Sequence, residues 1–247
     1  SLHTLCLGLG ALAPAIAKPL LTPAQCRAAQ AVITRISTAL AGQLVPHFEH
    51  QVLDAGKLLN CLNWFSRALK AELLPQQTPA ANHLFQTALT QLQHWSASSH
   101  STCLNSRQLA KAMVQLNTMV SKNLINIDAA TLTGAANRAT WASCVHNLCR
   151  QFLSNDQWLN GCHGVELVNV TNTLKDGLEL GLIDGTDASL KTAFAQIARR
   201  INQQSFTGSA SLTTLSNSAN FLRCLFEHGL LGDLASDSGQ AALHLLD

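Results

Sequence analysis

One hydrophobic register recurs five times along this chain of 247 residues. Each copy starts at an anchor leucine. The residues 4, 7 and 11 positions after the anchor are apolar, except for Thr171, and an apolar pair follows at positions 15 and 16. The anchors are Leu5, Leu58, Leu109, Leu167 and Leu215. Because each residue of an α-helix turns by ~100° about the axis, these side chains lie on one stripe of a helix. The register therefore predicts five amphipathic helices, each of which needs a partner to cover its stripe.

Residues at both ends of the predicted helices agree with this register. The residues four positions before the anchors are Ser1, Asp54, Asn105, His163 and Ser211. All of them except the histidine have a side-chain oxygen that can accept a hydrogen bond from the free N–H groups of a first helical turn. Fourteen residues after three of the anchors stand residues that tolerate the left-handed conformation ending many helices, namely Asn123, Gly181 and Gly229. Three kinds of signal thus predict the same helix boundaries.

A second helix is predicted after a short polar turn in each copy. These helices open at Thr22-Pro23, Pro79, Asp128, Asp187 and Asp237. A single hairpin cannot bury its apolar stripe alone, so the hairpins are expected to stack. We predict an all-α fold, an α-solenoid of about five stacked helical hairpins in a HEAT/armadillo-like superhelix. It would form one domain over residues 1–247, a fragment of a longer array, with repeat units near 1–53, 54–104, 105–162, 163–210 and 211–247.

Composition excludes several other classes of protein. With 47% hydrophobic and 12% charged residues the chain is too apolar to be disordered. Few aromatic residues, no Tyr and few β-branched runs argue against a β-sandwich or barrel. No uncharged apolar run reaches the ~20 residues that span a bilayer without a Pro or Gly break, so a soluble protein with no membrane partner is expected. The first 18 residues superficially resemble a signal peptide, but they fit the helical register instead.

The most suggestive polar feature is a pair of asparagines 2 and 5 positions after three of the anchors. These are Asn60 and Asn63, Asn169 and Asn172, and Asn217 and Asn220. The third copy has Lys111 and Val114 at the same positions, and the first has Leu7 and Gly10. Offsets 2 and 5 lie ~200° and ~140° round the helix from the anchor, opposite the apolar stripe. The amides are predicted either to hydrogen-bond the backbone of an extended peptide partner or to fix the angle between adjacent repeats.

Three stretches that carry these asparagines are similar to a known repeat. They read LLNCLNWFS at 58–66, LVNVTNTLKDG at 167–177 and LSNSANFLRC at 215–224. The pattern resembles the SKWP repeats of large type III effectors from plant-pathogenic bacteria, although no literal Ser-Lys-Trp-Pro is present. The resemblance implies a virulence protein that a bacterium secretes into the host cell. There it would act as a non-enzymatic protein–protein interaction scaffold, with a host protein or peptide as partner, no cofactor and no catalytic residue.

Two other functions stay open. The pattern is also similar to octotricopeptide RNA-binding repeats, and residues 1–162 carry eleven Lys or Arg against five Asp or Glu, whereas residues 163–247 carry five against nine. An RNA-binding surface usually has clustered cations with interleaved stacking aromatics, and the chain has no dense basic run. In the third alternative the repeats are the substrate-recruitment arm of an enzyme whose active site lies outside this fragment.

The spacing of the Cys and His residues gives little support for a metal site or for a catalytic nucleophile. Cys144, His146, Cys149, Cys162 and His163 are close in sequence. Their spacing matches no common zinc signature, and Cys144 and Cys149 would lie ~140° apart on a helix. The segment from His47 to His50 is not a His-Glu-x-x-His motif. The eight cysteines have no regular pairing, so buried, reduced thiols and no metal site are expected.

Overall fold

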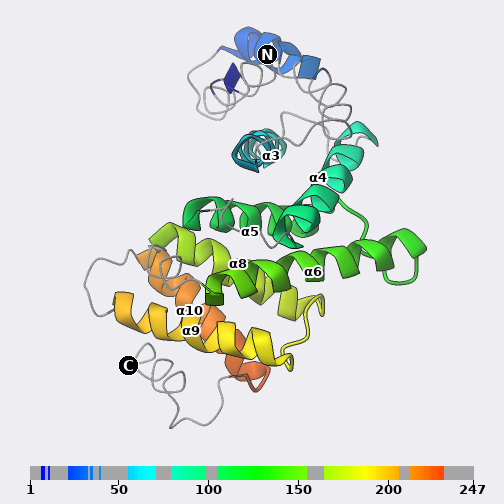
Figure 1. The fold of residues 1–247 in the computed structure, drawn as a ribbon. Helices are drawn as coiled ribbons and strands as arrows, with labels where there is room; N and C mark the ends of the chain where they lie inside the picture. Colours follow the sequence, from blue (N-terminus) through cyan, green and yellow to red (C-terminus); the bar gives the residue numbers. More distant parts are fainter. Residues whose placement is uncertain are drawn as a thin grey trace. The chain divides into compact units, whose positions relative to one another are not determined.

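The computed structural model describes residues 7, 8, 11, 22–32, 34, 35, 39, 55–70, 79–97, 105–154, 164–205 and 212–230. All regular secondary structure in these residues is helical, which confirms the all-α prediction (Figure 1). The labelled helices are α3 (Ala55–Lys70), α4 (Pro79–Ala97), α5 (Ser106–Ser121), α6 (Leu132–Ser154), α8 (Gly164–Glu179), α9 (Ala188–Ser205) and α10 (Leu212–Glu227), and residues 23–32 are helical as well. Within these described ranges no helix is both long and apolar enough to cross a bilayer.

Four first helices begin one residue after the positions that the register selects. These helices are α3, α5, α8 and α10, and the positions before them are 54, 105, 163 and 211. At α5 the Asn105 side-chain oxygen accepts from the Gln108 N–H at 2.9 Å, and the Gln108 side-chain oxygen accepts from the Asn105 N–H at 3.0 Å. Thr22 and Gln25 make the same reciprocal pair, at 3.4 and 2.9 Å. This capping box satisfies N–H groups that a first turn leaves without partners.

Three first helices end in the same left-handed cap. Asn123, Gly181 and Gly229 have φ angles of 51°, 60° and 64°. In each case the N–H of this residue donates to the carbonyl three residues earlier at 2.9 to 3.0 Å, and the next N–H donates to the carbonyl five residues earlier at 2.8 to 2.9 Å. This is the Schellman arrangement, which uses carbonyl groups that the helix end leaves over. The predicted helix ends are therefore confirmed at all three positions.

The starts of the second helices are confirmed at three places and wrong at one. The first of them begins at Pro23, directly after its cap Thr22. α4 begins at Pro79, and α9 begins at Ala188 directly after Asp187. α6 begins at Leu132, whereas the polar turn predicted a start after Asp128. The Asp128 carboxylate accepts from the Ala130 N–H within a tight turn, and the Thr131 hydroxyl accepts from the Gly134 N–H at 3.0 Å as the true cap of α6. The predicted helix after Asp237 lies outside the described residues.

Contacts divide the chain into two compact units. The first unit comprises residues 1–92 and 118–137, and the second comprises residues 93–117 and 138–247. In the first unit the ring of Phe65 meets that of Phe85 edge to face, with centroids 6.5 Å apart. In the second unit α8 packs against both α9 and α10, and Phe194 meets Phe221 at 6.2 Å. Each unit is therefore held by rings and aliphatic side chains from neighbouring helices.

The predicted apolar stripe is buried in two first helices and only partly in a third. All six positions in the copies that contain α5 and α8 are buried: Leu109, Met113, Leu116, Val120, Leu124 and Ile125, and Leu167, Thr171, Leu174, Leu178, Leu182 and Ile183. In α10 the prediction is wrong at Phe226, whose side chain is 65% exposed, while Leu215 and Ala219 are half-buried. α10 instead buries residues one position earlier, among them Thr214, Ser218 and Leu225. Residues at offsets 3, 6, 7 and 10 are buried in all three helices, so this face is the common core face.

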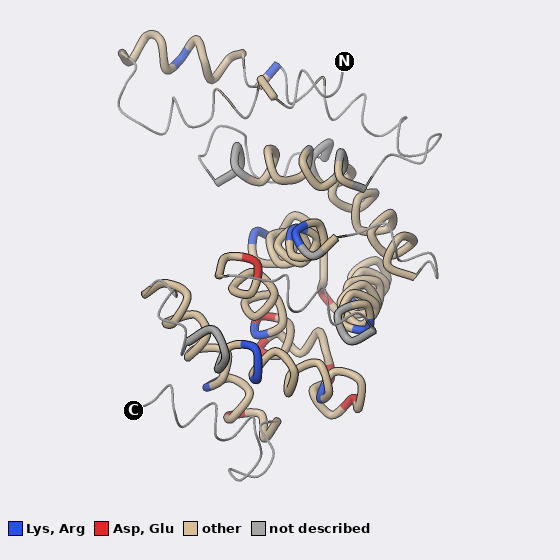
Figure 2. The backbone as a smooth tube through the Cα atoms, turned by 60° about the vertical axis from the view of Figure 1, so that its left-hand side comes forward, with Lys and Arg blue, Asp and Glu red and all other residues tan. Residues whose placement is uncertain are grey.

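Charge is distributed unevenly among the helices. None of the residues of α3, α4, α5 and α6 is Asp or Glu; α3, α5 and α6 carry Lys or Arg, and α4 carries neither (Figure 2). α8 carries Glu166, Asp176 and Glu179, and α10 carries Glu227.

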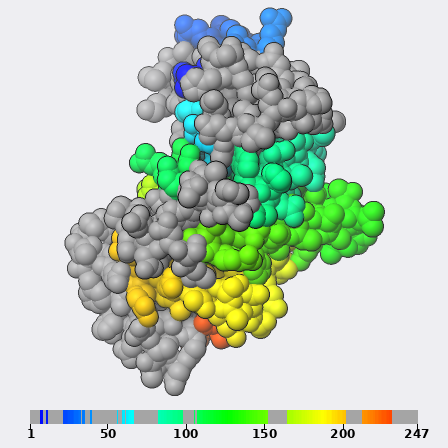
Figure 3. All heavy atoms as spheres, in the orientation of Figure 1, coloured from blue at the N-terminus to red at the C-terminus, as the bar shows by residue number. Residues whose placement is uncertain are grey.

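The start of α6, in green in Figure 3, lies at the surface, where the Leu132 side chain is 93% exposed.

Candidate interaction face

The first helices of the second unit share one stripe that packing leaves accessible. On α8 this stripe contains Val165, Asn169 and Asn172, and on α10 it contains Asn217 and Asn220. Val165 and Asn220 are exposed, and the other three are half-buried. The corresponding positions on α5 are Arg107, Lys111 and Val114, of which the arginine is exposed and the other two are half-buried. We call these stripes of α5, α8 and α10 the first-helix face.

The three helices of this face are neighbours in the second unit. The Thr173 hydroxyl of α8 lies 2.9 Å from the Met113 carbonyl oxygen of α5, and the Arg107 guanidinium lies 3.7 Å from the Glu166 carboxylate. α8 also packs against α10 (Figure 1). The structure therefore brings Asn169, Asn172, Asn217 and Asn220 onto adjacent helices of one unit. Asn60, which is exposed, and Asn63, which is half-buried, belong to α3 in the other unit.

Contacts between adjacent hairpins are made by polar residues outside the asparagine positions. The buried Thr173 hydroxyl lies within hydrogen-bond distance of Met113 on the previous first helix. Gln151 donates to the Ser96 carbonyl at 3.0 Å between two second helices. The Asn217 side chain donates to the Thr213 carbonyl of its own helix at 2.8 Å. Sequence reasoning missed Thr173 and Gln151, and the signal for Thr173 was a hydroxyl residue at offset 6 within an otherwise apolar surrounding.

The C-terminal ends of α8 and α10 carry charges that pair within each helix. Lys175 lies 2.8 Å from both the Asp176 and the Glu179 carboxylates, and Arg223 pairs with Glu227. Burial alone lowers the pKa of Lys175, but hydrogen bonds and charge from its two acidic partners outweigh burial and raise that pKa. The lysine ammonium therefore stays charged and held in place at neutral pH.

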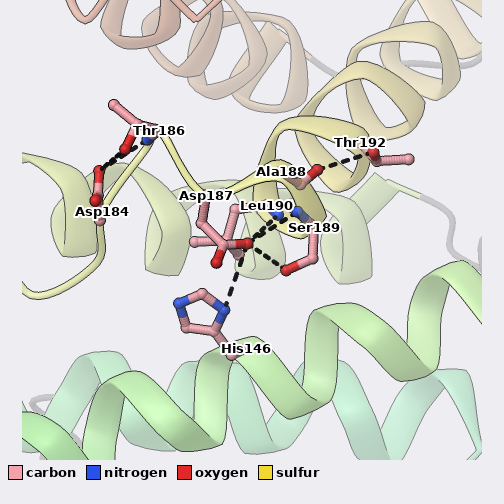
Figure 4. A network of polar contacts seen from close by, with 8 residues as sticks. All are labelled: His146, Asp184, Thr186, Asp187, Ala188, Ser189, Leu190 and Thr192. Carbon is pink, nitrogen blue, oxygen red and sulfur yellow. Dashed lines mark hydrogen bonds and ion pairs between the residues drawn. The ribbon is translucent and has the colours of Figure 1, made fainter.

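The turn between α8 and α9 holds a second group of carboxylates, which act as structural caps (Figure 4). Asp187 accepts from the N–H groups of Ser189 and Leu190 at 2.8 and 3.2 Å and from the Ser189 hydroxyl. The hydrogen bond from the Ser189 hydroxyl, followed by that from the Leu190 N–H, lowers the pKa of Asp187. His146 of α6 points toward this carboxylate, with its Nδ1 atom 4.0 Å from the Asp187 oxygen. The Asp187 carboxylate therefore caps the N-terminus of α9.

The cysteines of the described helices α6 and α10 lie in the core. Cys144 and Cys149 on α6 are buried, and burial raises the pKa of each thiol to about 12. A thiol with so high a pKa is a poor nucleophile and a poor metal ligand at neutral pH. Cys162 and His163 lie outside the described residues, as does the segment from 47 to 50. Among the residues that the structure does describe, no three His, Cys, Asp or Glu come together as a metal site.

Comparison with protein-family models, with curated proteins and with solved structures gives no match for this chain. The likeness of residues 58–66, 167–177 and 215–224 to SKWP repeats therefore stays a prediction from the sequence. The function has to be inferred from the first-helix face.

Proposed function

We propose that the chain is a segment of an α-solenoid whose first-helix face binds an extended stretch of a protein partner. No chemical step is part of this proposal, and the chain acts as a scaffold. The observation that carries it is the placement of the asparagines. In α8 and α10 they occupy the stripe that packing leaves accessible, while other residues make the contacts between hairpins.

Contacts at equivalent positions of successive hairpins support the solenoid. In the first unit Gln86 donates to Asn137, which lies 51 residues later. In the second unit Asn147 donates to Ser96 across the same separation of 51 residues. The predicted anchors for these hairpins are likewise 51 residues apart. In a solenoid each repeat touches its neighbours at matching places, and these contacts follow that rule.

The chemistry of the amide side chain supports a peptide partner. An asparagine offers two N–H donors and one carbonyl acceptor, which match the alternating C=O and N–H groups of an extended backbone. Asparagine is a mediocre helix former, so its return at Asn169 and Asn217 on α8 and α10 is best explained by a use for the amide. A repeated amide could hold the backbone of a partner without selecting its side chains.

The wider biological setting is also a proposal. The likeness of the asparagine-bearing stretches to SKWP repeats supports a bacterial effector that binds a host protein inside the host cell. RNA binding has less support, because five of the described aromatic rings are buried in the core and cannot stack on bases: Phe65, Phe85, Trp141, Phe194 and Phe221.

Selection of peptides tests the proposal. A random library of peptides about ten residues long, enough to cross three helices, is panned over the chain, and the selected peptides are measured by fluorescence anisotropy. Replacing Asn169 and Asn217 by Ala together should weaken binding about tenfold or more, because several backbone hydrogen bonds are lost. The double variant Asn82→Ala and Thr133→Ala, at exposed positions on the second helices α4 and α6, is the matched control and should bind normally.

Three results would contradict a peptide-binding role. The library yields no binder, or the asparagine variant binds as well as the parent chain. In the third, the variant loses much of its thermal stability, which would show that the amides fix the stacking of repeats. A labelled RNA pool that binds tightly at low salt and is released steeply as salt rises would favour the nucleic-acid alternative.

A further inference from the structure

One side of α10 leaves large apolar side chains accessible. Leu212 is 86% exposed and Phe226 is 65% exposed, and Leu215 and Ala219 between them are half-buried. We call these four residues the α10 apolar stripe. On α5 and α8 the residues at the anchor and at offsets 4 and 11 are all buried, so α10 differs from both helices. We propose that the α10 apolar stripe binds the same stripe of a second copy of this chain, with the two α10 helices antiparallel.

The stripe is separate from the first-helix face. Measured round the helix from the anchor Leu215, its four residues lie between ~0° and ~60°, because each residue turns by ~100°. Asn217 and Asn220 lie at ~200° and ~140° from the same anchor. Self-association through the stripe therefore does not use the first-helix face, and it is independent of peptide binding.

The stripe is complementary to itself. Leu212 stands seven residues before Ala219, and Phe226 stands seven residues after it. A two-fold axis at Ala219 places each residue of one helix opposite the residue equally far from Ala219 in the other copy. Leu212 then meets Phe226 of the second copy at both ends of the contact, and the small Ala219 lets the helices approach closely in the middle. A symmetric dimer interface requires a patch that fits itself in this way.

The spacing of the stripe agrees with a pair of packed helices. With Leu222 included, the apolar residues follow one another at intervals of three, four, three and four residues. This is the a/d pattern of a two-helix seam. Leu222 itself is buried, so the contact with a second copy relies on the four residues of the stripe.

The charges beside the stripe permit this pairing. None of its four residues is charged, and Arg223, which flanks it, forms an ion pair with Glu227 of its own helix. The two-fold axis places Arg223 opposite Leu215 of the second copy, where the methylene groups of the arginine cover apolar surface. No like charges meet across the axis, and no unpaired charge is buried.

The area of the stripe determines how strong the association is. At 86% and 65% exposure, Leu212 and Phe226 offer roughly 300 Å² of surface per copy, because one large side chain covers on the order of 150–250 Å² when it is fully buried. Stable dimers bury about 800 Å² per partner. We therefore expect a weak dimer with a dissociation constant of roughly 10–100 µM.

Sedimentation velocity of the full chain over a wide range of concentrations tests the inference. The parent chain should convert from monomer to dimer, and Leu212→Lys or Phe226→Glu should each weaken association about tenfold or more, since apolar contacts are lost at both ends. An equal mixture of these two variants should regain most of the association. In that mixed dimer the new lysine meets the new glutamate at one end, and Phe226 meets Leu212 at the other. Leu132→Lys is the matched control, because it makes the same change at an exposed leucine of α6 and should associate as the parent does.

Four outcomes would overturn the inference. A parent chain that stays monomeric throughout excludes the dimer, and if Phe226→Glu also lowers its melting temperature, residues of the same chain such as 231–247 cover the stripe instead. Two variants that dissociate but do not recover on mixing exclude the antiparallel arrangement. Association that Leu132→Lys weakens equally is not specific to α10. Association that disappears as salt rises depends on charge, because burial of apolar surface is not screened by salt. Circular dichroism of each variant verifies that it is folded, and Phe226→Gln, which should also weaken association, replaces Phe226→Glu if the latter unfolds.

Discussion

Gly177 offers a sharp test of how the common core face of α8 is packed. A Cβ atom at this position would lie 2.9 Å from the Cη2 atom of Trp141 and 3.2 Å from the Cδ1 atom of Ile183. The Trp141 ring is 1% exposed, and its indole N–H donates to the Leu116 carbonyl at 2.9 Å. The ring can give way only by disturbing that buried hydrogen bond.

Two opposing effects decide the result of Gly177→Ala. Replacing a helical glycine by alanine favours the helix by about 1 kcal/mol. Crowding a close-packed core costs about 1–3 kcal/mol, and a weakened buried hydrogen bond costs about 1 kcal/mol more. We therefore expect Gly177→Ala to lower the free energy of unfolding by about 2 kcal/mol, measured by urea unfolding with far-ultraviolet circular dichroism.

A double-mutant cycle identifies the cause. Trp141→Phe removes the ring atoms that the new methyl group meets, so Gly177→Ala in that background should be neutral or stabilising. The coupling between the two changes should be about 2 kcal/mol. If Gly177→Ala stabilises the parent chain, or if the cycle shows no coupling, then α8 and α6 do not pack as described.

Three further predictions concern caps and thiols. Asn105→Ala should lower the free energy of unfolding by about 1 kcal/mol, because the Gln108 N–H loses its acceptor, while Asn105→Asp should not; equal losses would refute the cap. Hydrogen bonds lower the pKa of Asp187, so its stabilising effect is complete above the ordinary pKa of 3.8 and is lost as the pH falls through the lower folded value. The stability difference between the parent chain and Asp187→Ala should therefore shrink on acidification, and a difference that grows would contradict this. Cys144 and Cys149, with pKa values of about 12, should resist iodoacetamide in the folded chain and react in urea at mildly alkaline pH, as peptide mass spectrometry can show. Rapid labelling of the folded chain would refute their burial.

Helix boundaries proved predictable because they depend on neighbouring residues. The cap at Asn105 and the left-handed residues Asn123, Gly181 and Gly229 form their bonds within a few positions of themselves. The start of α6 was mispredicted for a related reason. Asp128 and Thr131 both suit a cap, and the chain uses the first for a turn and the second for the helix.

The candidate face was only partly predictable. Offsets 2 and 5 were expected opposite the apolar stripe, and Asn169, Asn172, Asn217 and Asn220 do keep access to solvent. Their role in binding stays a prediction. That α5, α8 and α10 are neighbours in one unit could not be predicted, because a repeat pattern does not say which helices touch.

The sequence alone determined the helical class, the register and most helix ends, since periodicity and capping act over one or two turns. Tertiary structure decided which stripe of each helix became core. α5 and α8 bury their predicted stripes, whereas α10 leaves Phe226 exposed and buries Thr214 and Ser218. The cause is that burial depends on which neighbours cover a helix, and in α10 the covered side is the one that meets α8 and α9. The pattern of apolar residues indicates which side chains a helix can bury, and the neighbouring helices determine which of them are buried.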